Sequence, residues 1–300
     1  MYRAKTDWES TLTAWSQPLG KVEDEKAARA ITAIQRAVAN SNALGRHTVR
    51  TFVQGSYRNN TGVRQESDVD VGVLCPDTFH YNDLPSPHTR LSLGISDASY
   101  SYGDFRDDVE DALVTQFGRV AVKSGNKALN VKENTYRVDA DVVPCFEYRR
   151  YRDSGYGLTY DAGICLTARD GTFITNYPEQ QYQNGIKKDE AAYYRFKPMV
   201  RAVKKLSCEM EEEGVDAAKP MKSFLIECLV WNLPVPIFLS SNMWERVAEV
   251  LKTIEDMATY SSASMLEENA IKPLFGGTSA WTSHQVQRFA YEARRYIGAN

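Results

Sequence analysis

The chain has little of what marks several large classes of protein. Its five cysteines are scattered and none forms a C-x-x-C pair, which argues against a disulfide framework and against a zinc knuckle. No apolar run approaches the roughly 18 residues that a membrane-spanning helix needs. The first residues also lack the apolar core of a secretory signal. We therefore predict a protein of the reducing cytoplasm that makes no membrane contact.

An excess of basic charge is also missing. Lys and Arg number 36 against 39 Asp and Glu, a net charge of −3, so direct DNA binding is not expected. The four histidines are isolated in the sequence, which argues against a histidine metal site or a Ser-His-Asp triad. What remains is ordinary globular composition, with 43% apolar and 25% charged residues. Three hundred residues are enough for one large domain or two closely associated ones.

The pattern along the chain changes from mixed to helical near residue 180. Apolar side chains recur at helical spacing through the first forty residues. Strands are expected at 47–53, 69–74 and 136–143, and hairpins at 120–131 and 163–175.

Prolines and composition set the expected boundaries. Pro76 and Pro144 are expected to end two of the strands, and from about residue 189 the chain reads as almost entirely helical. We therefore expect a lobe at 1–180, which includes the N-terminal helix, and a helical lobe at 181–300. The N-terminal helix is expected to pack against both.

Aspartates gather on two of the predicted strands. Asp68 and Asp70 begin one strand, and Asp139 and Asp141 lie on another. Alternate residues of a strand point to one face, so each pair of carboxylates converges. If the strands are neighbours, the carboxylates repel strongly, and divalent metal is the simplest compensation. All-oxygen ligands suit Mg²⁺, and two such ions are the usual device for in-line phosphoryl or nucleotidyl transfer.

A Gly-Ser pair sharpens this interpretation. An isolated D-x-D is common at strand ends, and sugar-nucleotide transferases also use it on Mn²⁺. Here Gly55 and Ser56 end a predicted strand shortly before Asp68. Glycine allows close backbone approach to a phosphate, and its N–H with the serine hydroxyl can hold phosphate oxygens. A glycosyltransferase needs neither the Gly-Ser pair nor a third aspartate, so the combination favours nucleotidyl transfer.

These segments resemble the polymerase-β-like nucleotidyltransferases. The resemblance rests on 52–61 (FVQGSYRNNT), 67–71 (SDVDV) and 138–144 (VDADVVP). Together with 176–185 (NYPEQQYQNG) and 275–278 (FGGT), the first segment is similar to the bacterial CD-NTases, the relatives of cyclic GMP-AMP synthase and oligoadenylate synthetase. The likeness runs through most of the chain. It implies an α+β fold in which a long N-terminal helix links a mixed-sheet catalytic lobe to a helical C-terminal lobe that closes the nucleotide cleft.

The resemblance also implies roles for the aspartates. Asp68 and Asp70 would ligate two Mg²⁺ ions, with Mn²⁺ as an alternative. Asp141 would complete the metal site and help to activate the attacking hydroxyl. Asp141 matches the family better than Asp139, because it precedes Val-Val-Pro, and Asp139 would be its neighbour on the same face.

Five further positions are implied to bind nucleotide. Gly55 and Ser56 would hold the donor triphosphate, and Lys204 would be a second triphosphate ligand. Ser223 would reach the phosphates, and Phe224 would stack on a base.

Two of these positions have a plainer interpretation. Lys204 lies on a basic helix face that is ordinarily solvated, and Pro198 must start or kink that helix. Ser223 begins a helix that is apolar nearly all round, where its hydroxyl can bond back to the backbone.

The resemblance implies an enzyme that condenses nucleoside triphosphates into a cyclic di- or trinucleotide second messenger and releases pyrophosphate. ATP is the first substrate expected, with GTP, CTP and UTP as further ones. Family context implies anti-phage (CBASS) signalling, with a downstream effector that binds the product and with CBASS accessory proteins. The alternatives are a linear oligoadenylate-type or other transferase of the superfamily, and a non-catalytic nucleotide-binding module. The three aspartates argue against the module.

Overall fold

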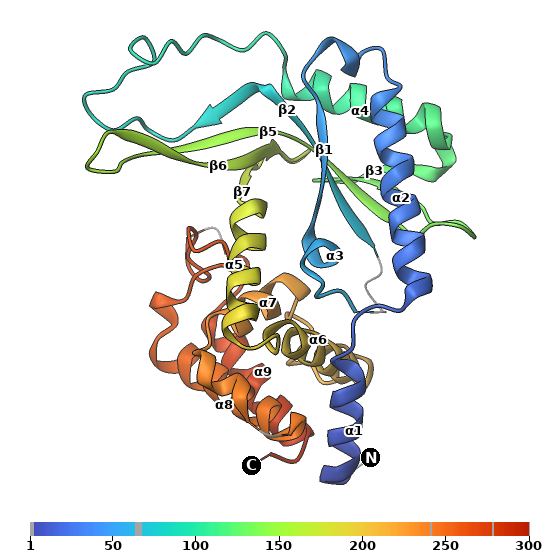
Figure 1. Ribbon diagram of the computed structural model, residues 1–300, viewed down its shortest axis with the longest axis vertical. Coiled ribbons are helices and arrows are strands. Elements are labelled where there is room, and N and C mark those ends of the chain that lie inside the picture. The colour runs from blue at the N-terminus through green and yellow to red at the C-terminus, as the bar shows by residue number, and fades with distance from the viewer. Residues whose placement is uncertain (1–2, 64–67, 241, 278, 300) are drawn as a thin grey trace. The chain divides into compact units, whose positions relative to one another are not determined.

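The computed structural model describes residues 3–63, 68–240, 242–277 and 279–299 (Figure 1). Residue 67 of the SDVDV segment and residue 278 of the FGGT segment lie outside the described residues. Two compact units form. The sheet unit comprises Lys21–Gly55 and Ser67–Pro178, and the helical unit comprises Met1–Gly20, Ser56–Glu66 and Glu179–Asn300. The expected α+β class with a helical C-terminal part is confirmed.

The N-terminal segment divides differently from the expectation. It forms two helices, α1 (Lys5–Trp15) and α2 (Lys21–Ala39), rather than one long one. Pro18 lies between them, and a proline disfavours helical conformation in the residue before it. The first helix groups with the helical unit and the second with the sheet unit. The unit boundary after Pro178 lies close to the predicted 180/181 boundary.

The sheet unit is built on one mixed sheet, in which the strand order is β1-β2-β5-β4-β3 and β6 connects β5 to β7. The strands are β1 (Arg50–Gln54), β2 (Val69–Tyr81), β3 (Val122–Ser124), β4 (Leu129–Val131), β5 (Ala140–Asp153), β6 (Leu158–Thr167) and β7 (Phe173–Asn176). β2 and β5 run parallel, whereas the other pairs are antiparallel. The first part of β5 pairs with β4 and the later part with β6.

Both long strands continue through the prolines that were expected to end them. Proline lacks an N–H, so it is tolerated where no ladder bond is needed. Pro76 lies where the register of β2 against β5 shifts. Pro144 lies between the last β5 residue that pairs with β4 (Val142) and the first that pairs with β6 (Phe146). Neither proline therefore removes a required hydrogen bond.

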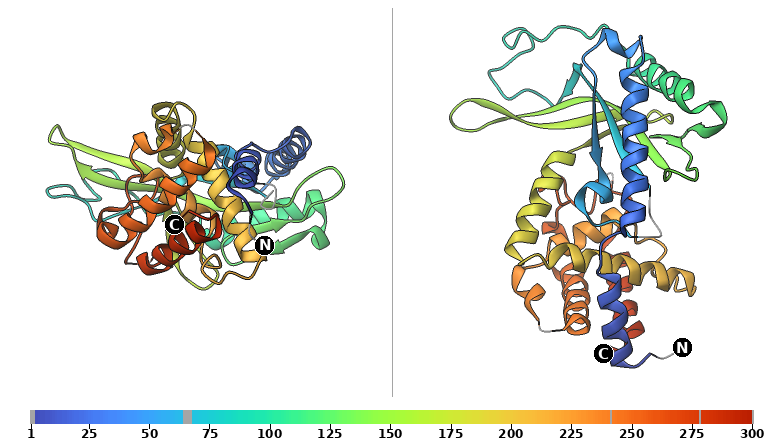
Figure 2. Two further views of the ribbon diagram at one scale, coloured as in Figure 1. Left: turned by 90° about the horizontal axis from the view of Figure 1, so that it is seen from below. Right: turned by 45° about the vertical axis from the view of Figure 1, so that its right-hand side comes forward.

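The two faces of the sheet differ in character. One face is aliphatic and is covered by α2, which contacts β1 and β2, and by α4 (Tyr102–Phe117), which contacts β3, β4 and β5 (Figures 1 and 2). Phe105 of α4 stacks on Phe146 of β5, with ring centroids 5.3 Å apart. Asp70 and Asp141 belong to the alternating positions of the opposite face. Beyond them on that face lies a small apolar cluster of Phe52, Leu74, Cys145 and Ile164.

The helical unit has its own core. Its helices are α1, α3 (Gly55–Asn59), α5 (Pro178–Ala191), α6 (Phe196–Glu212), α7 (Ser223–Trp231), α8 (Met243–Tyr260) and α9 (Ser283–Tyr296). α3 begins at the last residue of the sheet unit, and α5 begins earlier than the expected residue 189. Pro198 lies in the first turn of α6, where backbone N–H groups have no helical acceptor, so it starts the helix without kinking it. In the described ranges, no helix combines the length and apolarity required to cross a bilayer.

Substitution of Gly72 tests how tightly the carboxylate-bearing face of the sheet is packed. A Cβ at this position would lie 2.2 Å from the ring of Phe52. We expect Gly72→Ala to lower the free energy of unfolding by about 1–3 kcal/mol, because the ring is forced out of place. Gly45→Ala is the matched control, since nothing lies within 4 Å of its added Cβ. Urea denaturation measures both. Equal stability of the two variants would contradict this packing.

Candidate active site

Asp70 and Asp141 lie side by side in the sheet. The parallel register of β2 and β5 places them directly opposite one another. Neighbouring strands are about 4.8 Å apart, so the two side chains leave the same face as close neighbours. On its other side Asp70 pairs with Gln54, the last residue of β1. Asp68 precedes β2 by one residue and is exposed. The fold therefore brings the two predicted aspartate motifs together.

The register supports the choice of Asp141 over Asp139. Asn130 of β4 pairs with Asp141, and its side-chain amide donates a hydrogen bond to Asp141 Oδ1. Asp139 precedes β5, and its carboxylate accepts the backbone N–H of Glu133 instead. Asp139 is thus bonded to its own loop. Sequence reasoning did not find Asn130, because only the pairing of β4 with β5 places it beside a predicted site residue.

Gly55 lies directly against Asp70. Its φ is +68°, in the region that favours glycine, and a Cβ there would lie 2.0 Å from Asp70 Oδ2. Any other residue would displace the carboxylate. Gly55 and Ser56 are the first two residues of α3, so the predicted phosphate-binding pair occurs at a strand-to-helix turn.

The donor set of this face fits a hard divalent cation. Asp68, Asp70 and Asp141 offer carboxylate oxygens, which Mg²⁺ and Mn²⁺ prefer. Gly55 leaves room beside Asp70 that a side chain would fill. Among the described residues, the group of His, Cys, Asp or Glu side chains whose ligand atoms all lie within 4.8 Å of one another is a different one. It contains none of these three aspartates. Their role as metal ligands therefore stays a prediction.

Lys204 is buried, contrary to the plainer of its two interpretations, in which it lies on a solvated helix face. Its side chain is 1% exposed, and its Nζ lies 3.2 Å from Glu227 Oε2 and 3.2 Å from the backbone oxygen of Thr61. Arg201, on the same helix, is also buried and donates to the backbone oxygen of Ser16. The interpretation of this face as solvated is therefore wrong. Buried cations require partners, and these two have them.

Glu227 is the centre of a buried polar network in the helical unit. Besides Lys204, its carboxylate accepts hydrogen bonds from Asn59 Nδ2 at 2.6 Å and from Thr61 Oγ1 at 2.8 Å. Both donors belong to the segment that follows Gly55 and Ser56. Glu227 therefore holds this segment against α6 and α7. Sequence reasoning missed this residue, although a single carboxylate in an otherwise apolar helix was a signal for it.

A second carboxyl lies close to this network. Glu268 is fully buried, and neither of its carboxyl oxygens has a hydrogen-bond partner among the described residues. Gly185 of α5 makes room for it, because a Cβ there would lie 2.6 Å from Glu268 Oε1. Burial and the negative charge of Glu227 raise the pKa of Glu268 well above its ordinary value. The pKa of Glu227 is lowered, despite burial, by Lys204 and by its hydrogen-bond donors.

Ser223 and Phe224 begin α7 and are both partly buried. The Phe224 ring lies 6.1 Å from that of Trp281 in a tilted arrangement. Their contacts with phosphate and base stay a prediction.

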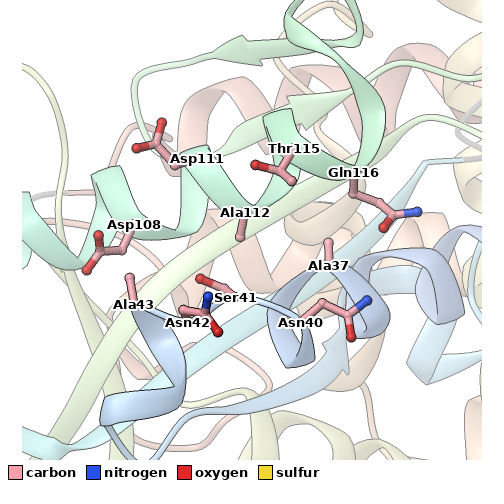
Figure 3. A pocket seen from close by; sticks show the side chains of 10 residues that line it. All are labelled: Ala37, Asn40, Ser41, Asn42, Ala43, Asp108, Asp111, Ala112, Thr115 and Gln116. Atoms are coloured by element: carbon pink, nitrogen blue, oxygen red, sulfur yellow. The ribbon is translucent and has the colours of Figure 1, made fainter.

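A hollow of about 270 Å³ lies between α2 and α4 in the sheet unit (Figure 3). Its polar lining includes Asn40, Asn42, Asp108 and Asp111. None of the predicted site residues lines it, so it is separate from the carboxylate face.

The buried pair can be tested by a double-mutant cycle. Lys204→Met or Glu227→Gln alone leaves one partner buried without its counterpart, and we expect each to lower the free energy of unfolding by about 3–5 kcal/mol. The double variant should lose clearly less than the sum. Lys252→Met, which breaks the exposed Lys252–Asp256 pair, should cost below about 1 kcal/mol. Additivity of the two buried substitutions would contradict their coupling.

Glu268 predicts a particular pH dependence of stability. The folded chain keeps the Glu268 proton above pH 4.5, the ordinary pKa, whereas the unfolded chain releases it. The stabilising contribution is therefore complete below that pH and decreases as pH rises towards the folded pKa, at a limiting slope of about 1.4 kcal/mol per unit. Glu268→Gln should remove this decrease, so its stability relative to the wild type should increase between pH 5 and 8. Urea unfolding across that range checks it, and a constant difference would refute it.

Comparison with known proteins agrees with this architecture. Residues 183–298 match the family model described as the cGAS/DncV-like nucleotidyltransferase C-terminal helical domain. Over 297 residues the chain is 39% identical to a cyclic dipyrimidine nucleotide synthase, CdnE, of Legionella pneumophila, covering 98% of this chain and 99% of that protein.

Two solved structures are also similar. One is the CdnE cyclic dinucleotide synthase of Elizabethkingia meningoseptica with GTP and Apcpp, at a TM-score of 0.80 and 32% identity, covering 97% of this chain and 98% of that one. The other is the c-UMP-AMP synthase CdnE of Rhodothermus marinus with Apcpp and Upnpp, at a TM-score of 0.83 and 28% identity, covering 96% and 94%. The chain therefore belongs to the cGAS/DncV-like nucleotidyltransferases, the CD-NTases, enzymes that condense nucleoside triphosphates into cyclic nucleotides.

Proposed function

We propose that Asp68, Asp70 and Asp141 form the catalytic centre of this cyclic nucleotide synthase and bind two Mg²⁺ ions, with Mn²⁺ as an alternative. The observation that carries the proposal is the in-register pairing of Asp70 with Asp141 beneath the Gly55 turn. Metal-assisted phosphate chemistry requires a site of hard oxygen ligands. Asp70 and Asp141 are adjacent, Asp68 lies two residues before Asp70, and the turn at Gly55 carries no side chain.

The residues then have distinct tasks. In each step a ribose hydroxyl attacks an α-phosphate and pyrophosphate leaves. The bound metal would neutralise the leaving phosphates and acidify the attacking hydroxyl. Asp141, oriented by Asn130, would accept the proton of that hydroxyl. Gly55 lets backbone approach the triphosphate, and Ser56 would donate its hydroxyl to it.

Lys204 is better explained as a positioning residue than as a direct phosphate ligand. Its ammonium is engaged by Glu227 and by Thr61 inside the helical unit. It thereby fixes the segment that begins with Ser56, and replacing it would move that segment. Ser223 and Phe224 are only partly buried at the start of α7, which supports their proposed contacts with phosphate and base.

We propose a cyclic dinucleotide with pyrimidine bases as the product. The support is the 39% identity, over nearly the full length, to the Legionella pneumophila protein named for cyclic dipyrimidine synthesis. UTP and CTP would then be the preferred substrates, ahead of the ATP and GTP that other relatives bind as themselves or as analogues. The product would act as an anti-phage (CBASS) messenger on a downstream effector in the cytoplasm, together with accessory proteins of such systems.

Product analysis tests the proposed reaction. The purified chain is incubated with all four labelled triphosphates and Mg²⁺ or Mn²⁺, then with phosphatase, and the products are identified by mass spectrometry. A phosphatase-resistant species with the mass of two linked pyrimidine nucleotides is expected. A ladder of linear products would favour an oligoadenylate-type transferase instead, and turnover of sugar nucleotides would favour a glycosyltransferase.

Substitutions at the two aspartate motifs separate their roles. We expect Asp70→Asn and Asp141→Asn each to lower the rate of product formation by about 100-fold or more, since an essential charge is lost. Both variants should keep the thermal stability of the metal-free wild type, because removing a clustered anion relieves repulsion. Asp139→Asn should lose far less activity, because Asp139 is bonded to its own loop. A greater loss in Asp139→Asn than in Asp141→Asn would overturn the assignment of the third carboxylate.

A further inference from the structure

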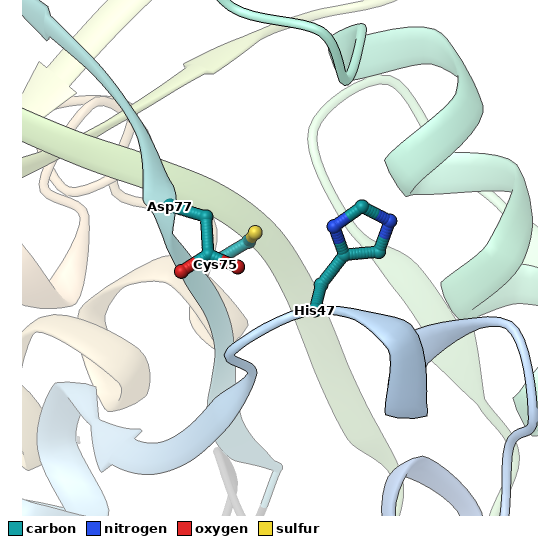
Figure 4. Close-up of side chains that lie close together, drawn as sticks. All are labelled: His47, Cys75 and Asp77. Carbon is teal, nitrogen blue, oxygen red and sulfur yellow. The ribbon is translucent and has the colours of Figure 1, made fainter.

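A histidine, a cysteine and an aspartate meet at the outer end of the β1–β2 pair. His47 follows the short 3-10 helix Leu44–Arg46, and Cys75 and Asp77 lie on β2 (Figure 4). One ligand atom from each of the three lies within 4.8 Å of the other two. From this cluster we propose that the chain binds one transition-metal ion of the zinc class here, separate from the nucleotidyltransferase centre.

The strand register explains why three residues so distant in sequence converge. β1 pairs with β2 antiparallel, with Arg50 opposite Leu74. Continuing this register by three residues brings His47 opposite Asp77. Cys75 precedes Asp77 by two residues and so lies on the same stretch of β2. The isolated histidines and scattered cysteines of the sequence gave no sign of this site, because it depends on a long-range pairing.

The donor chemistry selects the class of metal. An imidazole nitrogen, a thiolate sulfur and a carboxylate oxygen are the three ligand types that zinc sites use, and three protein ligands leave a fourth tetrahedral position for water. Mg²⁺ prefers oxygen ligands alone and would not choose a thiolate. Binding replaces the thiol proton of Cys75 with the metal and releases that proton to solvent, with no change of oxidation state.

The surroundings already orient two of the three ligands. The His47 ring stacks on Tyr100, with centroids 3.9 Å apart and planes within 4° of parallel. Within the described residues, no hydrogen bond occupies either ring nitrogen of His47. The backbone N–H of Thr48 donates to Asp77 Oδ2 at 2.7 Å, which fixes the orientation of this carboxylate. Such outer contacts orient the ligands of known metal sites. Cys75 is buried and Asp77 is exposed, so an ion would enter from the Asp77 side.

The site is distinct from the catalytic aspartates. Cys75 lies five residues further along β2 than Asp70 and has the opposite alternation, so the two side chains leave different faces. At about 3.3 Å per residue the separation along the strand is roughly 17 Å. A metal here would not touch a reacting phosphate. It would instead tie the segment after Leu44–Arg46 to β2, which stabilises the edge of the sheet that presents Gly55.

The test uses Co²⁺ as a spectroscopic substitute for Zn²⁺. The whole metal-free chain is titrated with Co²⁺ in excess Mg²⁺, so that hard-oxygen sites are filled. We expect one equivalent of Co²⁺ to produce a thiolate-to-cobalt charge-transfer band, and Zn²⁺ to abolish it by displacement. Cys75→Ala should remove the band. Cys208→Ala, at a partly buried cysteine of α6, is the matched control and should keep it.

Two positions that are not buried, His47 and Asp77, keep the test decisive if Cys75→Ala folds poorly. His47→Gln and Asp77→Asn should fold as the wild type does in the absence of metal and should bind Co²⁺ markedly more weakly. The thermal midpoint of the wild type should rise with Zn²⁺ concentration, whereas that of His47→Gln should rise much less. Absence of the band in the wild type, its persistence in Cys75→Ala, or a Zn²⁺-independent midpoint would each overturn the proposal.

Discussion

The parallel pairing of β2 with β5 is the constraint on which the rest of the sheet unit depends. It places Asp70 opposite Asp141, although the two are far apart in the sequence. Alternation sends the aliphatic neighbours of both aspartates to the other face, where α2 and α4 cover them. The strands on either side then complete the centre. β1 brings Gly55 against Asp70, and β4 brings Asn130 to Asp141. Burial of one face thus positions the charges of the other.

In the helical unit, a polar segment is held inside an apolar core. Glu227 holds it by accepting hydrogen bonds from Asn59 and Thr61, and Lys204 balances the charge of Glu227. Buried charges are tolerated only when they are paired, so this network is sensitive to the loss of any member. Glu268 lies beside it with no hydrogen bond to either carboxyl oxygen among the described residues, and burial and the charge of Glu227 raise its pKa well above the ordinary value. The positioning of the segment after Ser56 is therefore linked to the stability of the unit.

The local sequence pattern was enough to predict the strands that carry the motifs, but not the features that depend on long-range pairing. The D-x-D and Gly-Ser motifs are local, so their strands followed from alternation and turn residues, and the α+β class followed from the family resemblance that these motifs carry. The prediction that Pro76 and Pro144 end their strands was wrong. A proline ends a strand only where a neighbouring strand needs the N–H group that proline lacks. The burial of Lys204 could not be predicted, since its partner Glu227 lies on another helix. His47, Cys75, Asp77 and Asn130 were not found at all, because each depends on strand register.

The most direct test of the central claim is to locate bound metal. Crystals of the chain with Mn²⁺ and a non-hydrolysable nucleoside triphosphate would show manganese by its anomalous scattering. The account predicts manganese between the carboxylates of Asp70 and Asp141, with Asp68 as a further ligand and the triphosphate beside Gly55 and Ser56. Manganese bound elsewhere, with the Asp70–Asp141 pair free of metal while the triphosphate is bound, would contradict it.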